Sequence, residues 1–230
     1  MQFKLKKNKQ LGVWKMGFLD KLFDKSSDQQ QVGKDFYEAI KNRRSIYAID
    51  KNVKISEEKI EEVINFAVKH TPSAFNSQSA RVVVLFGEQH DKVWNITRET
   101  LRKIVPAENF SDTDQKMNLF GSGYGTVLFF EDQEVVEGLQ KQFASYSENF
   151  PVWSNQSSGM LQHVIWTALE LEGLGATLQH YNPLIDDEVK AAWNIPSSWK
   201  LIAQMPFGNP VSPAGEKEFQ PLTERVKVFK

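Results

Sequence analysis

The sequence MLQHVIWTALEL at residues 160–171 is the most apolar helical stretch of the chain, and EGLGATLQHYNP at residues 172–183 follows it directly. Apolar residues occupy more than one face of the predicted helix, namely Met160, Leu161, Val164, Ile165, Ala168, Leu169 and Leu171. A helix that is apolar nearly all round packs in the centre of a fold or in a subunit interface. Gly173 can end this helix, and the glycines that follow let backbone approach a ligand closely. The stretch therefore predicts a central helix that leads into a candidate binding segment.

Strands and further helices alternate on either side of this stretch. Strands are predicted at residues 81–86, 125–131 and 199–207, with a final extended piece at 225–229. Helices are predicted at residues 34–42, 56–71, 88–104, 133–146 and 183–193, and loops at 106–117 and 150–158. About four strands among many helices, without an internal repeat, indicate a single α/β or α+β domain.

The composition is that of a globular protein. Hydrophobic residues make up 40% and charged residues 25% of the 230 residues, which excludes a disordered or coiled-coil chain. The net charge of −1 gives no overall field that would attract nucleic acid or an anionic membrane. The absence of cysteine excludes thiolate catalysis and cysteine-ligated zinc, and it fits a reducing cytoplasm. No apolar run approaches the ~18 residues of a membrane span, so a soluble, cytoplasmic protein without stable membrane insertion is predicted.

The N-terminal part differs from the rest of the chain. Residues 1–9 are rich in lysine, residues 11–23 can form an amphipathic helix, and residues 26–31 have the polar composition of a linker. Lys15 interrupts the apolar run that a secretory signal needs. We therefore predict an N-terminal extension at residues 1–31 and a folded domain at residues 32–230. The extension is either mobile or docks on a membrane surface or a partner through its amphipathic helix.

Several common kinds of catalytic site are excluded by spacing. The glycines at 121, 123 and 125 lead into a predicted strand, whereas a dinucleotide-binding fingerprint opens a helix. The four histidines are scattered and show no metal-ligand spacing, and His163 on the apolar helix fits a core position. Glu170 and Glu172 point to different faces of a helix. The sequence thus predicts no metal and no catalytic side-chain pair.

Three polar clusters remain. Arg43, Arg44 and Ser45 join two guanidinium groups and a hydroxyl at a helix end, which suits a phosphate group but also fits a solvated helix terminus. Residues 72–79 (PSAFNSQS) form a loop whose two amides can bind the edge of a heterocycle. Residues 173–183 form the third cluster. Each of the last two is, taken alone, an ordinary loop.

In this order and at these separations, the three clusters resemble the FMN-dependent nitroreductase family from about Lys34 to the C-terminus. The loop at 72–78, the segment LQHYNP at 178–183 and the segment GEKEFQPLTERV at 215–226 resemble the branch named for fatty-acid repression mutants. The resemblance implies an α+β sandwich whose central antiparallel sheet is flanked by helices. It also implies an intertwined homodimer with two FMN sites at the interface.

The resemblance also implies which residues bind FMN. Arg43 and Arg44 would bind the phosphate and the pyrimidine edge, with Ser45 and Lys217 beside the phosphate. Further contacts to the flavin are implied for Pro72, Ser73 and Ala74 from the other subunit, for the side chains of Asn76 and Gln78, and for the backbone of Leu178, Gln179 and His180. Many family members carry proline where this chain has Ser79 and a basic residue where it has Tyr47. The change at Tyr47 removes a possible phosphate contact, which gives Lys217 or Arg225 a larger role.

The implied reaction is a ping-pong cycle in which NAD(P)H reduces FMN, which then passes two electrons to a nitroaromatic or a quinone. A role in redox or stress response would follow. Because the flavin N5 carries the hydride, no catalytic side chain is needed. Two alternatives stay open: a flavin-binding redox or lipid-signalling module with incidental reductase activity, and a scaffold without flavin.

Aromatic residues are abundant at 12% of the chain. Those in or beside the predicted site and interface loops are Phe75, Phe110, Phe120, Tyr124, Phe150, Trp153 and Tyr181. Aromatic rings can stack with flat acceptors. We therefore expect Phe75 and Tyr124 to line the substrate position.

Overall fold

The computed structural model describes residues 36–230, and the chain divides into two units at residues 1–41 and 42–230. Within the first unit, residues 36–41 are helical, as predicted, and residue 42 continues the helix. The predicted amphipathic helix at 11–23, the linker at 26–31 and the predicted boundary at 31/32 lie outside the described residues.

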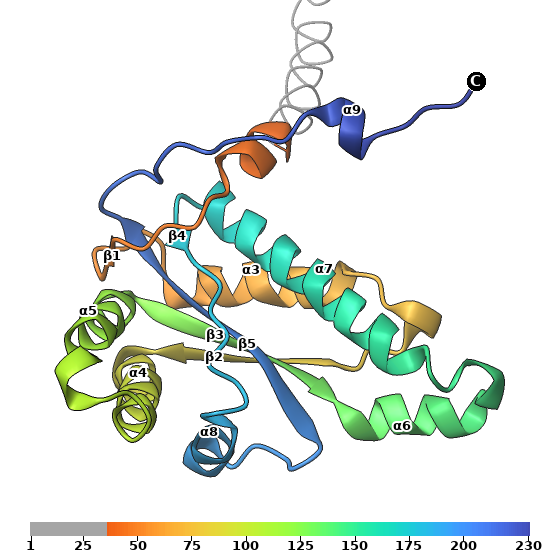
Figure 1. The fold of residues 1–230 in the computed structure, drawn as a ribbon, viewed down its shortest axis with the longest axis horizontal. Coiled ribbons are helices and arrows are strands. Elements are labelled where there is room, and N and C mark those ends of the chain that lie inside the picture. Colours follow the sequence, from red (N-terminus) through yellow and green to blue (C-terminus); the bar gives the residue numbers. More distant parts are fainter. Residues whose placement is uncertain (1–35) are drawn as a thin grey trace, which may run out of the picture. The chain divides into compact units, whose positions relative to one another are not determined.

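A central sheet organises the second unit, and within residues 36–230 it has five strands in the order β1-β5-β3-β2, with β4 also paired to β5. The strands are β1 (Ile49–Asp50), β2 (Ala80–Phe86), β3 (Gly125–Asp132), β4 (Gly175–Ala176) and β5 (Trp199–Pro210). Every pair of these strands is antiparallel. Figure 1 shows β3 and β5 crossing the middle of the unit. The fold is therefore α+β, as expected.

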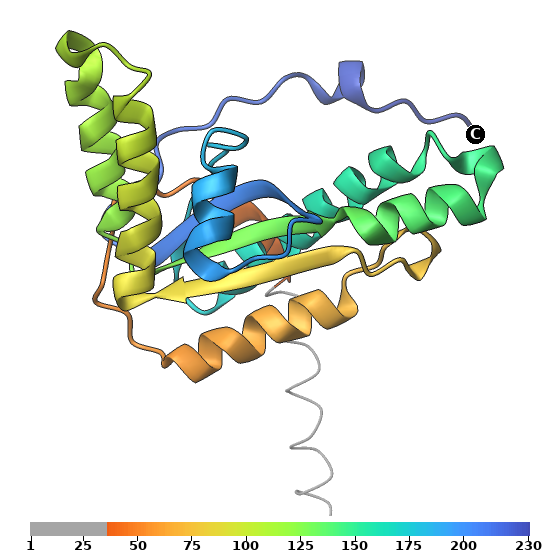
Figure 2. The same ribbon diagram turned by 90° about the horizontal axis from the view of Figure 1, so that it is seen from below.

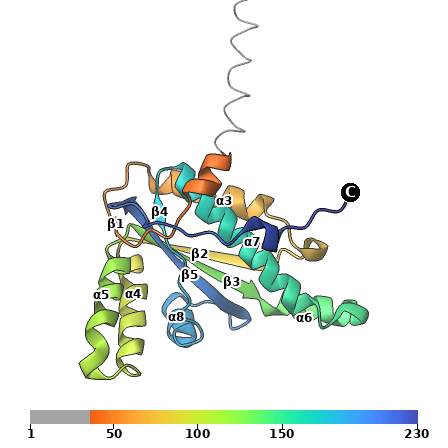
Figure 3. The same cartoon turned by 45° about the horizontal axis from the view of Figure 1, so that its top comes forward.

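Helices cover both faces of the sheet. On one face lie α3 (Glu57–His70) and α7 (Phe150–Leu171), and on the other lie α4 (Gly87–Arg102), α5 (Phe110–Gly121) and α8 (Asp186–Trp193). Figure 2 shows α3 on the opposite side of the sheet from α4 and α8, and Figure 3 shows α4 and α5 side by side. Two short helices complete the unit, α6 (Gln133–Gln142) and α9 (Leu222–Arg225).

Strand β3 shows how the sequence builds this sandwich. Every residue of β3 is buried, and alternate side chains of a strand point to opposite faces. Val127 and Phe129 pack into the core beneath α3 and α7, while Leu128 and Phe130 pack into the core beneath α4, α5 and α8. A continuous apolar strand is what a sheet covered on both faces requires.

Helix α7 is longer than predicted, because the expected loop at 150–158 forms its first turns. Pro151 lies at the start of the helix, where its missing N–H is not needed, so a proline that suggests a loop in sequence begins a helix in space. The buried residues Leu161, Ile165 and Leu169 form one face. Met160, Val164 and Leu171 on the remaining surface are at least 38% exposed in the single chain.

Three other sequence predictions were wrong. The predicted loop at 106–117 is largely helix α5, in which Phe110, Met117 and Phe120 are buried at helical spacing. The extended piece at 225–229 forms no strand, and β1 and β4 were missed because each has only two residues. No helix among residues 36–230 has the length and apolar character needed to cross a membrane.

Candidate functional site

Two clusters that lie far apart in the sequence meet beside β4. Ser45 forms a bridge with Ala176, and the N–H of Ile46 donates to the carbonyl of Ala176 at 3.0 Å. Gly175 makes this approach possible, because a Cβ at its position would lie 2.9 Å from Cγ2 of Ile46. The Arg43-Arg44-Ser45 turn is therefore fixed next to the segment that follows the central helix.

The backbone after β4 offers an unpaired edge. The N–H of Thr177 donates to Pro206 at 3.2 Å, and Gln179 exchanges two hydrogen bonds with Gln204 at 2.7 and 2.9 Å. Since N–H groups alternate along an antiparallel pair, those of Leu178 and His180 point away from β5. Neither has a hydrogen-bond partner among residues 36–230. This edge can donate to a ligand that lies against it.

The two arginines form a positive centre. The Nη2 of Arg44 donates to the carbonyl of Gly215 at 2.7 Å, which brings the chain segment bearing Lys217 close to Arg44. The guanidinium of Arg43 lies 4.4 Å above the ring of Trp166, and its buried Nε has no partner among the described residues. Burial and the neighbouring charge of Arg44 lower the pKa of Arg43. The site therefore has unused donors and an uncompensated positive charge, both of which suit an anion.

Sequence reasoning missed Trp166, which supports Arg43. The sequence indicated His163 for the core, but it is exposed on α7. Partial burial of its ring and the charge of Arg43 lower the pKa of His163. A stacked ring and an exposed imidazole therefore belong to the surroundings of the arginine pair. Only their helical spacing on α7, three residues apart, could have indicated this.

The loop at residues 72–79 has an unusual backbone. Phe75, Asn76 and Gln78 adopt positive φ angles of 57°, 49° and 49°. Such angles are uncommon outside glycine and cost of order 1–3 kcal/mol each, and they concentrate at functional sites. Inside the loop, the hydroxyl of Ser73 accepts a hydrogen bond from the N–H of Gln78 at 3.0 Å. The side chains of Asn76 and Gln78 are exposed, so the loop presents two amides to its surroundings.

The loop and the arginine pair lie at different edges of the sheet. The loop leads into β2, an edge strand, whereas residues 177–180 run along the outer side of β5. Three strand spacings separate these edges, about 14 Å across the sheet. A cavity of about 240 Å³ beside Pro72, Ser73 and Gln78 is smaller than the ~300–1,000 Å³ of typical ligand pockets. A single chain therefore does not bring the two groups to one ligand.

The two aromatic residues expected to line a substrate are also apart. Phe75 packs in a cluster of rings, with centroid distances of 5.1 Å to Phe143, 5.4 Å to Phe150 and 5.9 Å to Trp153. The ring of Tyr124 lies against Phe86, at the far end of β2 from the loop, and its hydroxyl is 3.5 Å from Glu57. Phe75 and Tyr124 do not form one wall within a chain.

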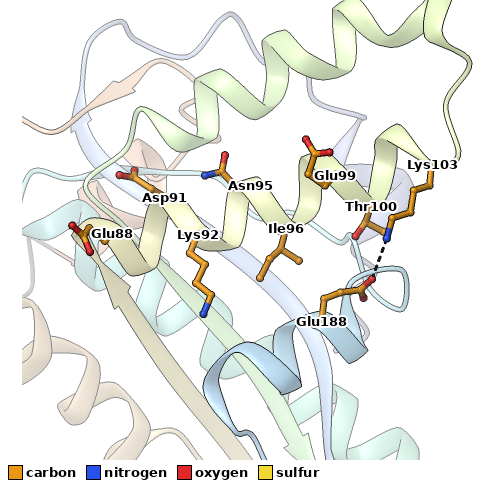
Figure 4. A pocket seen from close by; sticks show the side chains of 9 residues that line it. All are labelled: Glu88, Asp91, Lys92, Asn95, Ile96, Glu99, Thr100, Lys103 and Glu188. Carbon is orange, nitrogen blue, oxygen red and sulfur yellow. Dashed lines mark ion pairs between the residues drawn. The ribbon is translucent and has the colours of Figure 1, made fainter.

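A larger groove lies elsewhere, between α4 and α8 (Figure 4). It has a volume of about 480 Å³, and its lining is mostly acids and lysines, with an ion pair between Lys103 and Glu188 at 3.6 Å. None of the predicted site residues lines it. Among residues 36–230 no three His, Asp or Glu side chains lie close enough to hold a metal ion. The arginine pair, the free edge and the strained loop thus remain the candidate site.

Comparison with known proteins identifies the class of protein. The sequence model described as the nitroreductase family matches residues 40–209, which is most of the chain. The chain belongs to the nitroreductase family, and it is an oxidoreductase of the nitroreductase type.

Two relatives come from Saccharomyces cerevisiae. The putative nitroreductase HBN1 is 38% identical over 189 residues, with 81% of this chain and 93% of HBN1 covered. The nitroreductase FRM2 is 33% identical over 189 residues, with 80% of this chain and 93% of FRM2 covered. They confirm the resemblance to the fatty-acid-repression-mutant branch.

Among solved structures, the nitroreductase CinD from Lactococcus lactis is 48% identical with a TM-score of 0.78, and the match covers 85% of this chain and 100% of CinD. CinD has been solved in complex with chloramphenicol and with 4-nitrophenol.

Proposed function

We propose that the chain is an FMN-dependent, cytoplasmic homodimer that uses NAD(P)H to reduce nitroaromatics or quinones in a ping-pong reaction. The main support for this proposal is the junction at Ala176, where the Arg43-Arg44-Ser45 turn is joined to the free backbone edge at 177–180. A positive centre beside outward-pointing N–H groups matches a ligand that has a phosphate at one end and hydrogen-bond acceptors on a flat ring.

The residues at this junction fit FMN. Arg43, Arg44 and Lys217 would hold the phosphate and the pyrimidine edge, with Ser45 beside the phosphate. The N–H groups of Leu178 and His180 would donate to acceptors on the ring edge. Bound FMN would supply the two-electron transfer chemistry. The protein would position the ring and place positive charge where negative charge develops during reduction.

A second copy of the chain would complete the site. The loop carrying Pro72, Ser73, Ala74, Asn76 and Gln78 lies about 14 Å from the free edge across the sheet, so it would contact the flavin held by the partner. Exposed apolar side chains on α3 and α7 support such an interface; they are Phe66, Val68, Val152, Met160, Val164 and Leu171. Phe75, beside the loop amides, would then lie over the ring that a flat acceptor stacks on.

The nature of the acceptor is supported by CinD, which has been solved with two nitroaromatic compounds, chloramphenicol and 4-nitrophenol. Neither NADH nor NADPH is favoured by a residue pattern in this chain. We therefore propose the nitroaromatic or quinone class rather than one compound.

The visible spectrum of the purified protein tests the proposal. Flavin bands should bleach on anaerobic addition of NADH or NADPH and return on addition of 4-nitrophenol. Full FMN occupancy with slow NAD(P)H oxidation would instead indicate a flavin-binding signalling module. A protein that stays colourless after incubation with FMN would contradict the proposal.

Arg44→Ala tests the phosphate assignment. It should weaken FMN binding about tenfold or more, because a charge-assisted hydrogen bond contributes about 1.5–3 kcal/mol. Arg102→Ala is the matched control, since Arg102 lies on α4 and pairs with Glu99 and Asp114. Equal FMN affinity of the two variants would remove Arg44 from the site.

A further inference from the structure

Glu131, near the end of β3, is a buried carboxyl group that the proposed function does not use. The residue is only 1% exposed. Its Oε2 accepts hydrogen bonds from the hydroxyls of Ser79 at 2.6 Å and Ser154 at 2.7 Å. Its Oε1 is buried and has no partner among residues 36–230. Buried polar atoms without a partner are rare in native proteins, so this position needs an explanation.

The two hydroxyls come from different parts of the fold. Ser79 is the last residue of the loop at 72–79, and Ser154 lies in the first half of α7. Glu131 itself belongs to the central strand β3. One carboxyl group therefore ties the loop to the sheet and to the long helix.

Neighbouring contacts hold the same end of the loop. The N–H of Asp132 donates to the carbonyl of Ser79 at 2.9 Å. The Nη1 of Arg81 donates to the carbonyl of Gln78 at 2.7 Å, and Nη2 of the same side chain pairs with Asp132 at 3.0 Å. Glu131 extends this group to α7 through its hydrogen bond with Ser154.

The loop needs such an anchor. Three of its residues hold left-handed backbone conformations, which persist only where the surrounding structure determines them. If the anchor is lost, those residues can relax toward ordinary conformations. The amides of Asn76 and Gln78 would then be displayed in many orientations rather than one, and a ligand would have to order them on binding.

We propose that Glu131 is a positioning residue that, through Ser79 and Ser154, holds the loop at 72–79 in the conformation that presents Asn76 and Gln78 to the flavin. The inference rests on the proposed function, because it assumes that the loop contacts FMN. The unpartnered Oε1 fits this role. The carboxyl group is oriented so that Oε2 accepts both hydroxyl donors, and this orientation leaves Oε1 without a hydrogen bond to any described residue. Glutamine is a close substitute, because it keeps one oxygen that can accept both hydroxyl donors. Burial raises the pKa of Glu131.

FMN binding by the full-length chain provides the test, measured by equilibrium dialysis of wild type, Glu131→Ala and Glu131→Gln. Glu131→Ala should weaken FMN binding about tenfold, the cost of ordering a released loop on binding. Glu131→Gln should stay within about threefold of wild type, because one amide oxygen can accept both hydroxyl donors. Hydrogen exchange at residues 76–79 should accelerate in the alanine variant only.

Thr126→Val is the matched control, because it removes a buried polar contact from the other end of β3 without touching the loop. It should destabilise the protein while leaving FMN affinity and loop exchange unchanged. If Glu131→Ala does not fold, Ser79→Ala takes its place, with a smaller loss in the same direction.

Wild-type affinity and wild-type loop exchange in the alanine variant would overturn the proposal. An equal loss of affinity in Thr126→Val would also overturn it, since general destabilisation would then explain both. If wild type binds no FMN, the proposed function fails, and the exchange measurement still decides whether Glu131 anchors the loop.

Discussion

The two ends of strand β3 differ in how their buried polar side chains find hydrogen-bond partners. At Thr126, the hydroxyl oxygen accepts a hydrogen bond from Nε1 of Trp94 at 2.9 Å and lies 2.8 Å from Nδ1 of His90. The Nε2 of His90 lies 3.2 Å from the carbonyl of Gly121. Because Trp94 can only donate, the hydroxyl proton is free to bond Nδ1, and Nε2–H then donates to Gly121. Each polar side-chain atom of Thr126, His90 and Trp94 therefore has a partner.

At the other end of the strand, the hydrogen bonding of Glu131 is incomplete. Two hydroxyls share one carboxylate oxygen, and the other oxygen has no partner in the described part of the chain. The first end joins α4, α5 and the sheet, which carry no predicted site residue apart from Tyr124. The second end supports the loop at 72–79. The comparison indicates that the buried polar groups are all hydrogen-bonded at the end that serves stability alone. At the end that holds a binding loop, one buried oxygen is left without a partner among the residues that the structure describes.

The largest effect should come from Thr126→Val. It leaves His90 Nδ1 and Trp94 Nε1 buried without partners, and each lost partner costs about 1–3 kcal/mol. We expect the free energy of unfolding to fall by roughly 2–4 kcal/mol in urea titrations, with a normal FMN content. A loss below about 0.5 kcal/mol would show that the hydrogen bonds at Thr126 contribute no more to stability than those at Glu131.

A smaller effect should follow from Ser154→Ala. Glu131 keeps its bond to Ser79, so about 1 kcal/mol of stability should be lost, the usual net value of one hydrogen bond. The same urea titration measures it, and Ser147→Ala is the control, because the Ser147 side chain makes no hydrogen bond within residues 36–230. A loss as large as that of Thr126→Val would mean that the Glu131 end is equally dependent on each bond.

The pH dependence of stability should have opposite signs at the two ends. Burial lowers the pKa of His90 below its unfolded value of about 6.5, so its stabilising contribution is present above that pH and is lost as the pH falls through the folded pKa. Burial raises the pKa of Glu131 above about 4.3, despite its bonds to Ser79 and Ser154. Its contribution is present below that pH and is lost as the pH rises through the folded pKa.

Urea unfolding of wild type, His90→Gln and Glu131→Gln between about pH 4.5 and 7.5 separates the two contributions. His90→Gln should reduce the loss of stability on acidification, and Glu131→Gln should remove the loss on raising the pH. Identical pH profiles for all three proteins would contradict both assignments.

The smallest effect should come from Phe143→Leu. Its ring lies 5.1 Å from Phe75 and 6.1 Å from Phe150, and an aromatic pair contributes about 0.5–1.5 kcal/mol. The loop at 72–79 would lose part of the ring packing around Phe75 but would keep its hydrogen bond to Glu131. We expect about 0.5 kcal/mol of lost stability in urea and a slight acceleration of hydrogen exchange at Phe75 and Asn76. Exchange as fast as in Glu131→Ala would make the rings, rather than the carboxyl group, the main anchor.

Much of the fold was predictable because it depends on local pattern. The strands at 81–86 and 125–131 follow from their β-branched and apolar runs, and the spacing of apolar residues predicted α3, α4 and the second half of α7. The failures also have local causes. The expected loop at 150–158 contains Pro151, which is compatible with the first turn of a helix, and β4 is too short for any periodicity.

The site was predictable as three groups of residues but not as an arrangement. Glu131 could have been found, because it continues the alternation of Val127 and Phe129 and so places a carboxylate on the covered face beneath α7. Trp166 beneath Arg43 and Gly215 beside Arg44 had no such signal, because each contact joins distant parts of the chain.

By itself the sequence determined most of the longer helices and strands, the absence of cysteine chemistry and the residues that resemble a family motif, since these depend on composition and short-range spacing. Only the tertiary structure decided that Ser45 meets Ala176, that the loop at 72–79 lies at the other edge of the sheet, and that Glu131 binds Ser79 and Ser154. The reason is physical. Strand pairing and burial join residues that are distant in the chain, and hydrogen bonding and pKa values depend on those neighbours rather than on sequence order.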